Sequence, residues 1–185
     1  MPILNASELQ RLPIHGQLLA FARSYLAAAE VLCERLSATE DSANYADGAV
    51  VMSLAFHSLE LLFKAGILKA EPLEQFSGKS GHDLTALSAR FFKLYPTRDF
   101  QFEVPFRYEL AEFVEPMREE ELVALRAYAR EQERCMPQDQ RHRYPIDIDG
   151  KPWNGIFGFE PHTFLAMLQD LQKAYARIHP QLNAC

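Results

Sequence analysis

Apolar residues recur with a helical period along most of the 185-residue chain, and this pattern predicts five helices. The third helix starts where Ser80 and Asp83 have capping-box spacing, and it ends before Pro96. Strand-like alternation is confined to two short stretches, so we expect an all-α, up-and-down bundle of about five helices. The predicted helices cover residues 17–36, 49–69, 82–95, 119–135 and 161–178.

The segments between these helices differ in character. Residues 99–106 alternate apolar and polar side chains but contain Pro105, which predicts a short extended or irregular piece. A turn of helix over residues 106–114 is a candidate lead-in to the fourth helix. Residues 136–158 form a long Pro- and Gly-rich loop, typical of a functional or mobile segment, with a hairpin predicted around Asp149-Gly150. We expect residues 1–185 to form one domain.

The second predicted helix is apolar on nearly every side except for one polar stripe, formed by Ser53, His57, Glu60 and Lys64. Intervals of three and four residues place these side chains on one narrow face. Glu60 and Lys64 have the spacing of a helical ion pair. The stripe is either a polar network that fixes how helices or subunits pack, or a pocket. In a pocket, His57 would transfer protons and Lys64 would hold a phosphate or carboxylate.

Gly81-His82-Asp83, at the start of the third helix, is a second candidate. An acid such as Asp83 is favoured in a first helical turn because the helix dipole stabilises negative charge there. His82 either caps this helix or faces the second one. The structural role is the simpler interpretation for Asp83, and both roles stay open for His82.

A third candidate is a series of basic residues that starts in the fourth predicted helix. Its side chains follow at four-residue intervals and continue into the loop beyond the helix, which suits phosphate oxygens. The alternative is a solvated helix face, because several glutamates lie on the same helix. The residues are Arg126, Arg130, Arg134, Arg141, His142 and Arg143.

Composition narrows the possible chemistry. With 48% hydrophobic and 24% charged residues the chain resembles ordinary globular proteins, and a net charge of −6 disfavours a surface that binds nucleic acid all over. Three cysteines without metal-type spacing indicate reduced thiols in a cytoplasm. The apolar run 49–68 carries charges, so we expect no membrane span. Zinc-type, P-loop and nucleophile-elbow motifs are missing from the sequence, so we expect no metal and no cofactor.

The second and third predicted helices together resemble the HEPN superfamily of α-helical domains. The resemblance lies in the motifs Glu60-x-x-x-Lys64-Ala65 and His82-Asp83-Leu84-x-x-Leu87, with a further Arg143-Tyr144-Pro145 element before the last helix. It implies a nucleotide- or RNA-binding homodimer of a defence or toxin–antitoxin system, with an antitoxin or nucleotidyltransferase as partner protein. The implied ligand-binding residues are Glu60, Lys64, His82, Arg141 and Arg143.

Ribonucleases of this superfamily use an Arg followed a few residues later by a His. The pairs Arg11–His15 and Arg134–His142 do not have that spacing. This mismatch speaks against the usual ribonuclease site of the superfamily. One alternative is still a metal-independent endoribonuclease toxin with an unorthodox site, for which His57 and His142 are catalytic candidates and Arg141 and His142 would meet across a dimer interface. The other alternative is a non-catalytic structural or partner-binding helical module.

Aromatic residues give a second argument for a homodimer. Several of them lie in the segments between the predicted helices, where one small bundle has little room to bury them. These residues are Phe100, Phe102, Phe106 and Trp153.

Overall fold

The computed structural model describes residues 6–39, 44–77, 81–105, 118–135, 143–152 and 159–183. Of these described residues 75% are helical, which confirms the predicted all-α bundle. Within the described residues, the only β-type pairing is an isolated bridge between Ile146 and Pro152. The elements are α1 (Ser7–Gln10), α2 (Ile14–Ala38), α3 (Tyr45–Ala70), α4 (Leu84–Leu94), the 3-10 helix η3 (Arg98–Phe100), α5 (Glu119–Cys135) and α6 (Pro161–Asn183).

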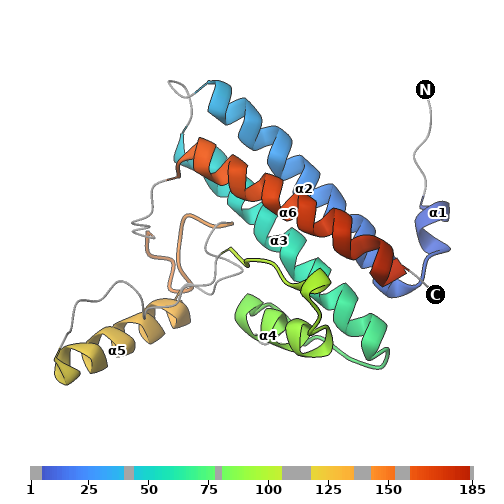
Figure 1. The fold of residues 1–185 in the computed structure, drawn as a ribbon. Coiled ribbons are helices and arrows are strands. Elements are labelled where there is room, and N and C mark those ends of the chain that lie inside the picture. The colour runs from blue at the N-terminus through green and yellow to red at the C-terminus, as the bar shows by residue number, and fades with distance from the viewer. Residues whose placement is uncertain are drawn as a thin grey trace.

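Helix α3 lies at the centre of the bundle, where it packs against α2, α4 and α6 (Figure 1). A helix that is apolar on nearly every side is stable only when neighbours cover it, and α3 has this composition. Helices α2 and α6 each contribute one apolar face. The largest fully buried side chains include Phe56, Phe63, Ile67, Leu19, Leu26, Leu168 and Ile178.

By length and composition alone, α3 could also cross a membrane. In the structure, 78% of its most apolar stretch is buried inside the bundle, as in the core helix of a globular protein.

Gly66 lets α4 approach α3 closely. A Cβ atom at this position would lie 2.6 Å from Cδ2 of Phe91, which is fully buried. The hydroxyl of Tyr95 donates a hydrogen bond to the Gly66 carbonyl at 2.9 Å. This close contact fixes α4 against α3 and thereby sets where the residues just before α4 can lie.

Helix α4 begins at Leu84, and Asp83 is its N-cap. Oδ1 of Asp83 accepts hydrogen bonds from Thr85 N at 2.9 Å and Ala86 N at 3.1 Å, as expected for a cap. The predicted capping box that starts at Ser80 is therefore wrong, because Asp83 stands before the first turn rather than inside it. Ser80 lies outside the described residues.

Two aromatic residues after α4 pack into the core or against it. Phe100 is 8% exposed and stacks on Tyr95, and Phe102 stacks on Phe63 with a centroid distance of 5.9 Å. The expectation that Phe100 and Phe102 are too exposed for one bundle is therefore wrong. Phe106, Trp153 and the candidate helical turn over 106–114 lie outside the described residues.

The predicted helix over 119–135 is confirmed as α5, which lies apart from the bundle (Figure 1). The predicted hairpin is confirmed as a tight turn. Asp147 N donates to Lys151 O at 2.9 Å, and Gly150 has a φ of 75°, which glycine adopts without strain.

Candidate functional site

Glu60 is the centre of a cluster that also contains His57, Lys64 and His82, called here the Glu60 cluster. Its Oε1 accepts a hydrogen bond from Lys64 Nζ at 2.6 Å, and His82 Nδ1 lies 3.1 Å from the same oxygen. His57 Nδ1 lies 3.7 Å from Oε2, which is within ion-pair range but too long for a hydrogen bond. The carboxylate thus has one imidazole beside each oxygen.

The four side chains are buried to different degrees. The side chain of Glu60 is 2% exposed and that of Lys64 is 11% exposed, whereas His57 is 28% exposed and His82 is 48% exposed. The structural interpretation fits Glu60 and Lys64, and the role of a ligand-binding pocket stays a prediction. The charged pair is a closed network, and the two imidazoles reach the surface.

Aromatic neighbours fix two members of the cluster. The ring of Tyr25, from α2, meets His57 edge to face at a centroid distance of 4.7 Å. Lys64 Nζ lies 5.3 Å from the centroid of Phe76, which is a cation–π distance. The ammonium group is held between a carboxylate and a ring, so its charge is largely satisfied within the protein.

The surroundings of Glu60 lower the pKa of its carboxyl. Burial by itself works to raise this pKa, but the contacts with His57, Lys64 and His82 outweigh burial and hold the pKa at about 2 instead of the usual 4.5. The Lys64 contact is the shortest and involves a full charge, so we regard it as the dominant stabilising contact. Glu60 is therefore ionised at neutral pH.

We expect Glu60 to make the protein less stable as pH falls from about 4.5 to about 2. The folded-state pKa is the lower one, so the unfolded state takes up the proton first and stability is lost across this window. The shift corresponds to about 3 kcal/mol. Urea unfolding at a series of pH values measures this loss, as the pH-dependent difference in unfolding free energy between the wild type and Glu60→Gln. Parallel pH curves for the two proteins would contradict the assignment.

The remaining predicted residues do not join the Glu60 cluster in the described part of the chain. Arg143 is exposed at the start of the segment 143–152. Arg134 pairs with Glu131, at 2.7 and 2.9 Å, on α5. Arg141 and His142 lie outside the described residues, and so does the side chain of Arg130.

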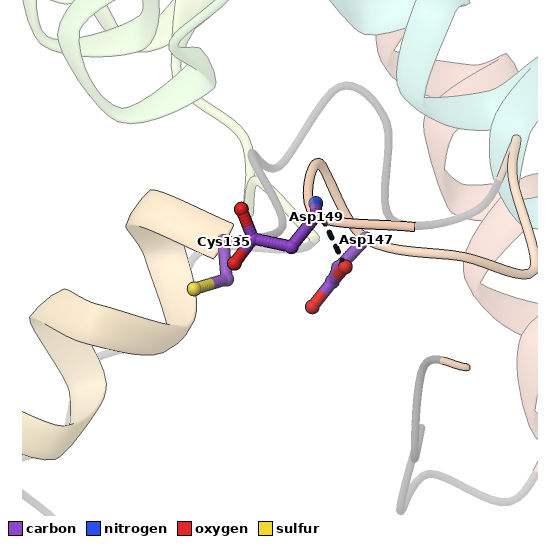
Figure 2. A group of neighbouring side chains, drawn as sticks. All are labelled: Cys135, Asp147 and Asp149. Carbon is purple, nitrogen blue, oxygen red and sulfur yellow. Dashed lines mark hydrogen bonds between the residues drawn. The ribbon is translucent and has the colours of Figure 1, made fainter. Parts of the chain in front are cut away.

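Cys135, Asp147 and Asp149 come together although no sequence motif links them (Figure 2). Their possible ligand atoms lie within 4.8 Å of one another. Asp147 Oδ1 accepts hydrogen bonds from the backbone N atoms of Asp149 and Lys151, both at 2.9 Å. This carboxylate therefore stabilises the turn.

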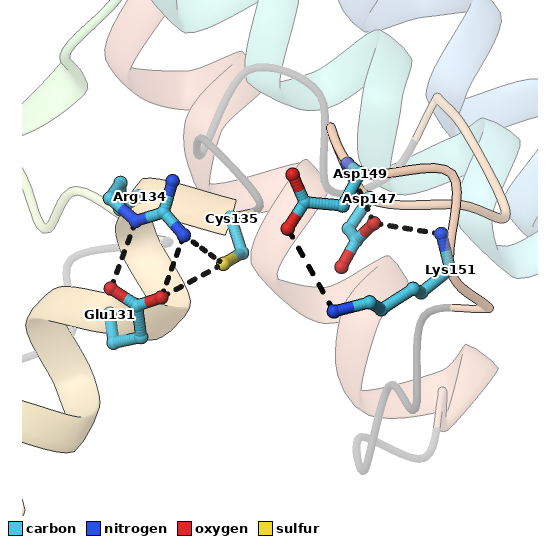
Figure 3. Close-up of polar contacts among 6 residues, drawn as sticks. All are labelled: Glu131, Arg134, Cys135, Asp147, Asp149 and Lys151. Carbon is cyan, nitrogen blue, oxygen red and sulfur yellow. Dashed lines mark hydrogen bonds and ion pairs between the residues drawn. The ribbon is translucent and has the colours of Figure 1, made fainter.

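The thiol of Cys135 has partners of its own (Figure 3). It donates to Glu131 Oε1 at 3.4 Å and accepts a hydrogen bond from Arg134 at 3.3 Å. Burial, followed by the hydrogen bond to Glu131, raises the pKa of this thiol. Since the thiol stays protonated and the Asp147 carboxylate caps the turn, we interpret this group as structural.

A second polar network was missed because it joins three helices. Ser58 Oγ donates to the Ala22 carbonyl at 2.6 Å, and the Tyr175 hydroxyl lies 2.8 Å from Ser58 Oγ. All three residues are buried, so the network links α2, α3 and α6 and offers nothing to a ligand. The only feature of the sequence that pointed to this network was Ser58, a serine on the inward face of an apolar helix.

The chain matches no protein-family model, and it matches no curated protein and no solved structure. The functional argument therefore rests on the residues themselves.

Proposed function

We propose that this HEPN-like protein binds the phosphate groups of a nucleotide or RNA at the surface formed by His57 and His82. The observation that carries the proposal is the difference in exposure within the Glu60 cluster. The Glu60 carboxylate is buried, yet it lies beside the imidazoles of His57 and His82, which are both partly exposed to solvent. Buried groups that orient exposed ones are a common feature of binding sites.

The charges of the cluster favour an anionic ligand. Glu60 and Lys64 compensate each other, so any proton taken up by an imidazole gives the exposed surface a positive charge. A carboxylate only accepts hydrogen bonds, and the His82 nitrogen that faces Glu60 must therefore carry a hydrogen. Nε2 of His82 is left for the ligand, and in the charged ring it donates to a phosphate oxygen.

The same geometry favours endoribonuclease activity as a second candidate function. A buried carboxylate that orients an imidazole is the arrangement of a general base. Nε2 of His82 would take the proton from a ribose 2′-hydroxyl, and the 2′-oxygen would attack the adjacent phosphorus. The 5′-oxygen would leave with a proton from a second acid, for which His57 is the candidate. The products are a 2′,3′-cyclic phosphate and a 5′-hydroxyl.

Binding is tested with a 5′-labelled single-stranded RNA by fluorescence anisotropy, and with ADP by calorimetry. We expect His82→Ala and His57→Ala each to weaken binding about tenfold, which corresponds to the loss of one charge-assisted hydrogen bond. His162→Ala, at an exposed position in the first turn of α6, is the matched control and should bind like the wild type. Failure of the wild type to bind either probe, or equal binding by all variants, would remove the proposal.

Cleavage is tested on the same RNA in the presence of EDTA, with products separated on a denaturing gel. Fragments that end in a cyclic phosphate, and that are missing with His82→Ala, would support the ribonuclease. If the RNA stays intact but its binding depends on His82, the result supports the binding function and contradicts the ribonuclease.

A further inference from the structure

The structure contains a groove between α2 and α6, separate from the Glu60 cluster. Its volume is about 500 Å³, within the range of small-molecule sites. On α2, Gly16, Ala20 and Ala27 line the groove, and their small side chains leave space beside α6, which runs alongside α2 in Figure 1. Tyr25, which contacts His57, projects from a different side of α2 than Arg23, because the two residues are two positions apart on a helix.

One wall of the groove carries a positive charge that has no ion-pair partner among the described residues. Arg23 lines the groove and makes no hydrogen bond or ion pair within the described part of the chain. No Asp or Glu is among the lining residues. The acid Glu30, seven positions further along α2, accepts a hydrogen bond at 2.9 Å from Nε2 of Gln172, which is itself a lining residue, so a carboxylate stands near the Gln172 end of the groove. An isolated guanidinium beside a concave surface is a natural partner for an anion.

Polar groups on α6 face Arg23 across the groove. His179 and Asn183 stand one helical turn apart, and the Asn183 amide lies 3.1 Å from the His179 ring. Burial and then the charge of Arg23 lower the pKa of His179, so the field of Arg23 reaches the opposite wall. The polar groups supply hydrogen-bonding capacity, while Leu12, Ala20 and Ala27 supply apolar lining.

We propose that the groove between α2 and α6 binds a small organic anion, whose carboxylate or phosphate group pairs with Arg23 while its apolar part contacts Leu12, Ala20 and Ala27. This binding site is independent of the phosphate-binding surface at His57 and His82. A planar guanidinium can offer two parallel N–H groups to either kind of anion.

The test is an NMR titration of the full chain with benzoate, phenyl phosphate and the neutral control benzamide. We expect benzoate or phenyl phosphate to shift the signals of Ser24, His179 and Asn183, with benzamide binding at least about tenfold more weakly. The anion that binds more tightly shows whether the groove prefers a carboxylate or a phosphate group. Equal binding of benzamide, or no shift with any probe, would overturn the proposal.

Variants separate this groove from other basic surfaces. Arg23→Gln should abolish the shifts, and Arg23→Lys should retain only part of them because the paired N–H geometry is lost. Arg35→Gln, an exposed arginine on the same helix outside the groove, and His82→Ala should both bind like the wild type. Undiminished binding by Arg23→Gln would disprove the assignment, whereas a loss with His82→Ala would place the probe at the Glu60 cluster instead.

Discussion

Glu60→Gln is expected to lower the free energy of unfolding at pH 7 by about 3–5 kcal/mol. The substitution keeps the size of the side chain but removes the charge beside Lys64 Nζ, which is 2.6 Å from Oε1 and almost fully buried. An uncompensated buried ammonium is costly, because the ring of Phe76 and the remaining amide replace neither water nor a carboxylate. Urea unfolding measures this difference in free energy. We expect the free energy to depend on urea concentration with the same slope in both proteins.

A double variant separates the charge effect from general disruption. Glu60→Leu combined with Lys64→Met removes both charges, and we expect its stability to return close to that of the wild type, or to exceed it. Glu131→Gln is the matched surface control, because Glu131 forms an ion pair of similar length with Arg134 in an exposed position. The urea midpoint of this control should be the same as that of the wild type. If the double variant is as unstable as Glu60→Gln, the cost does not come from an unpaired charge.

Local contacts of the candidate site were predictable from the sequence. The ion pair of Glu60 with Lys64 follows from a four-residue interval on a helix, and that interval alone places the two side chains together. The extent of α5 was predicted as well, from the helical pattern of residues 119–135. Helical periodicity is a property of neighbouring residues, so it is visible without the fold.

Contacts between distant residues were not predictable in the same way. The sequence left open whether His82 caps a helix or faces α3, and its position beside Glu60 depends on how closely α4 packs on α3. The burial of Phe100 and Phe102 was missed for a related reason. Two backbone carbonyls of their segment, at Asp99 and Gln101, accept hydrogen bonds from Arg177, and a contact over such a separation leaves no periodic signal.

Gly66→Ala is expected to destabilise the protein by about 2 kcal/mol, although alanine is the better helix former. The added Cβ would lie 2.6 Å from Cδ2 of Phe91, which cannot move aside because it is fully buried and packs against Tyr95 and Phe100. Helix α4 must therefore shift away from α3. Thermal and urea unfolding measure the loss, and His82-dependent ligand binding should weaken with it.

Two further variants test whether the clash with Phe91 is the cause. Gly16→Ala adds the same methyl group to α2, where it meets nothing closer than 3.3 Å, so a much smaller change is expected. Combining Gly66→Ala with Phe91→Leu makes room for the methyl group, and the double variant should be less destabilised than the sum of the two single variants. Strict additivity, or a Gly66→Ala protein more stable than the wild type, would show that α4 does not depend on this glycine for its position beside Glu60.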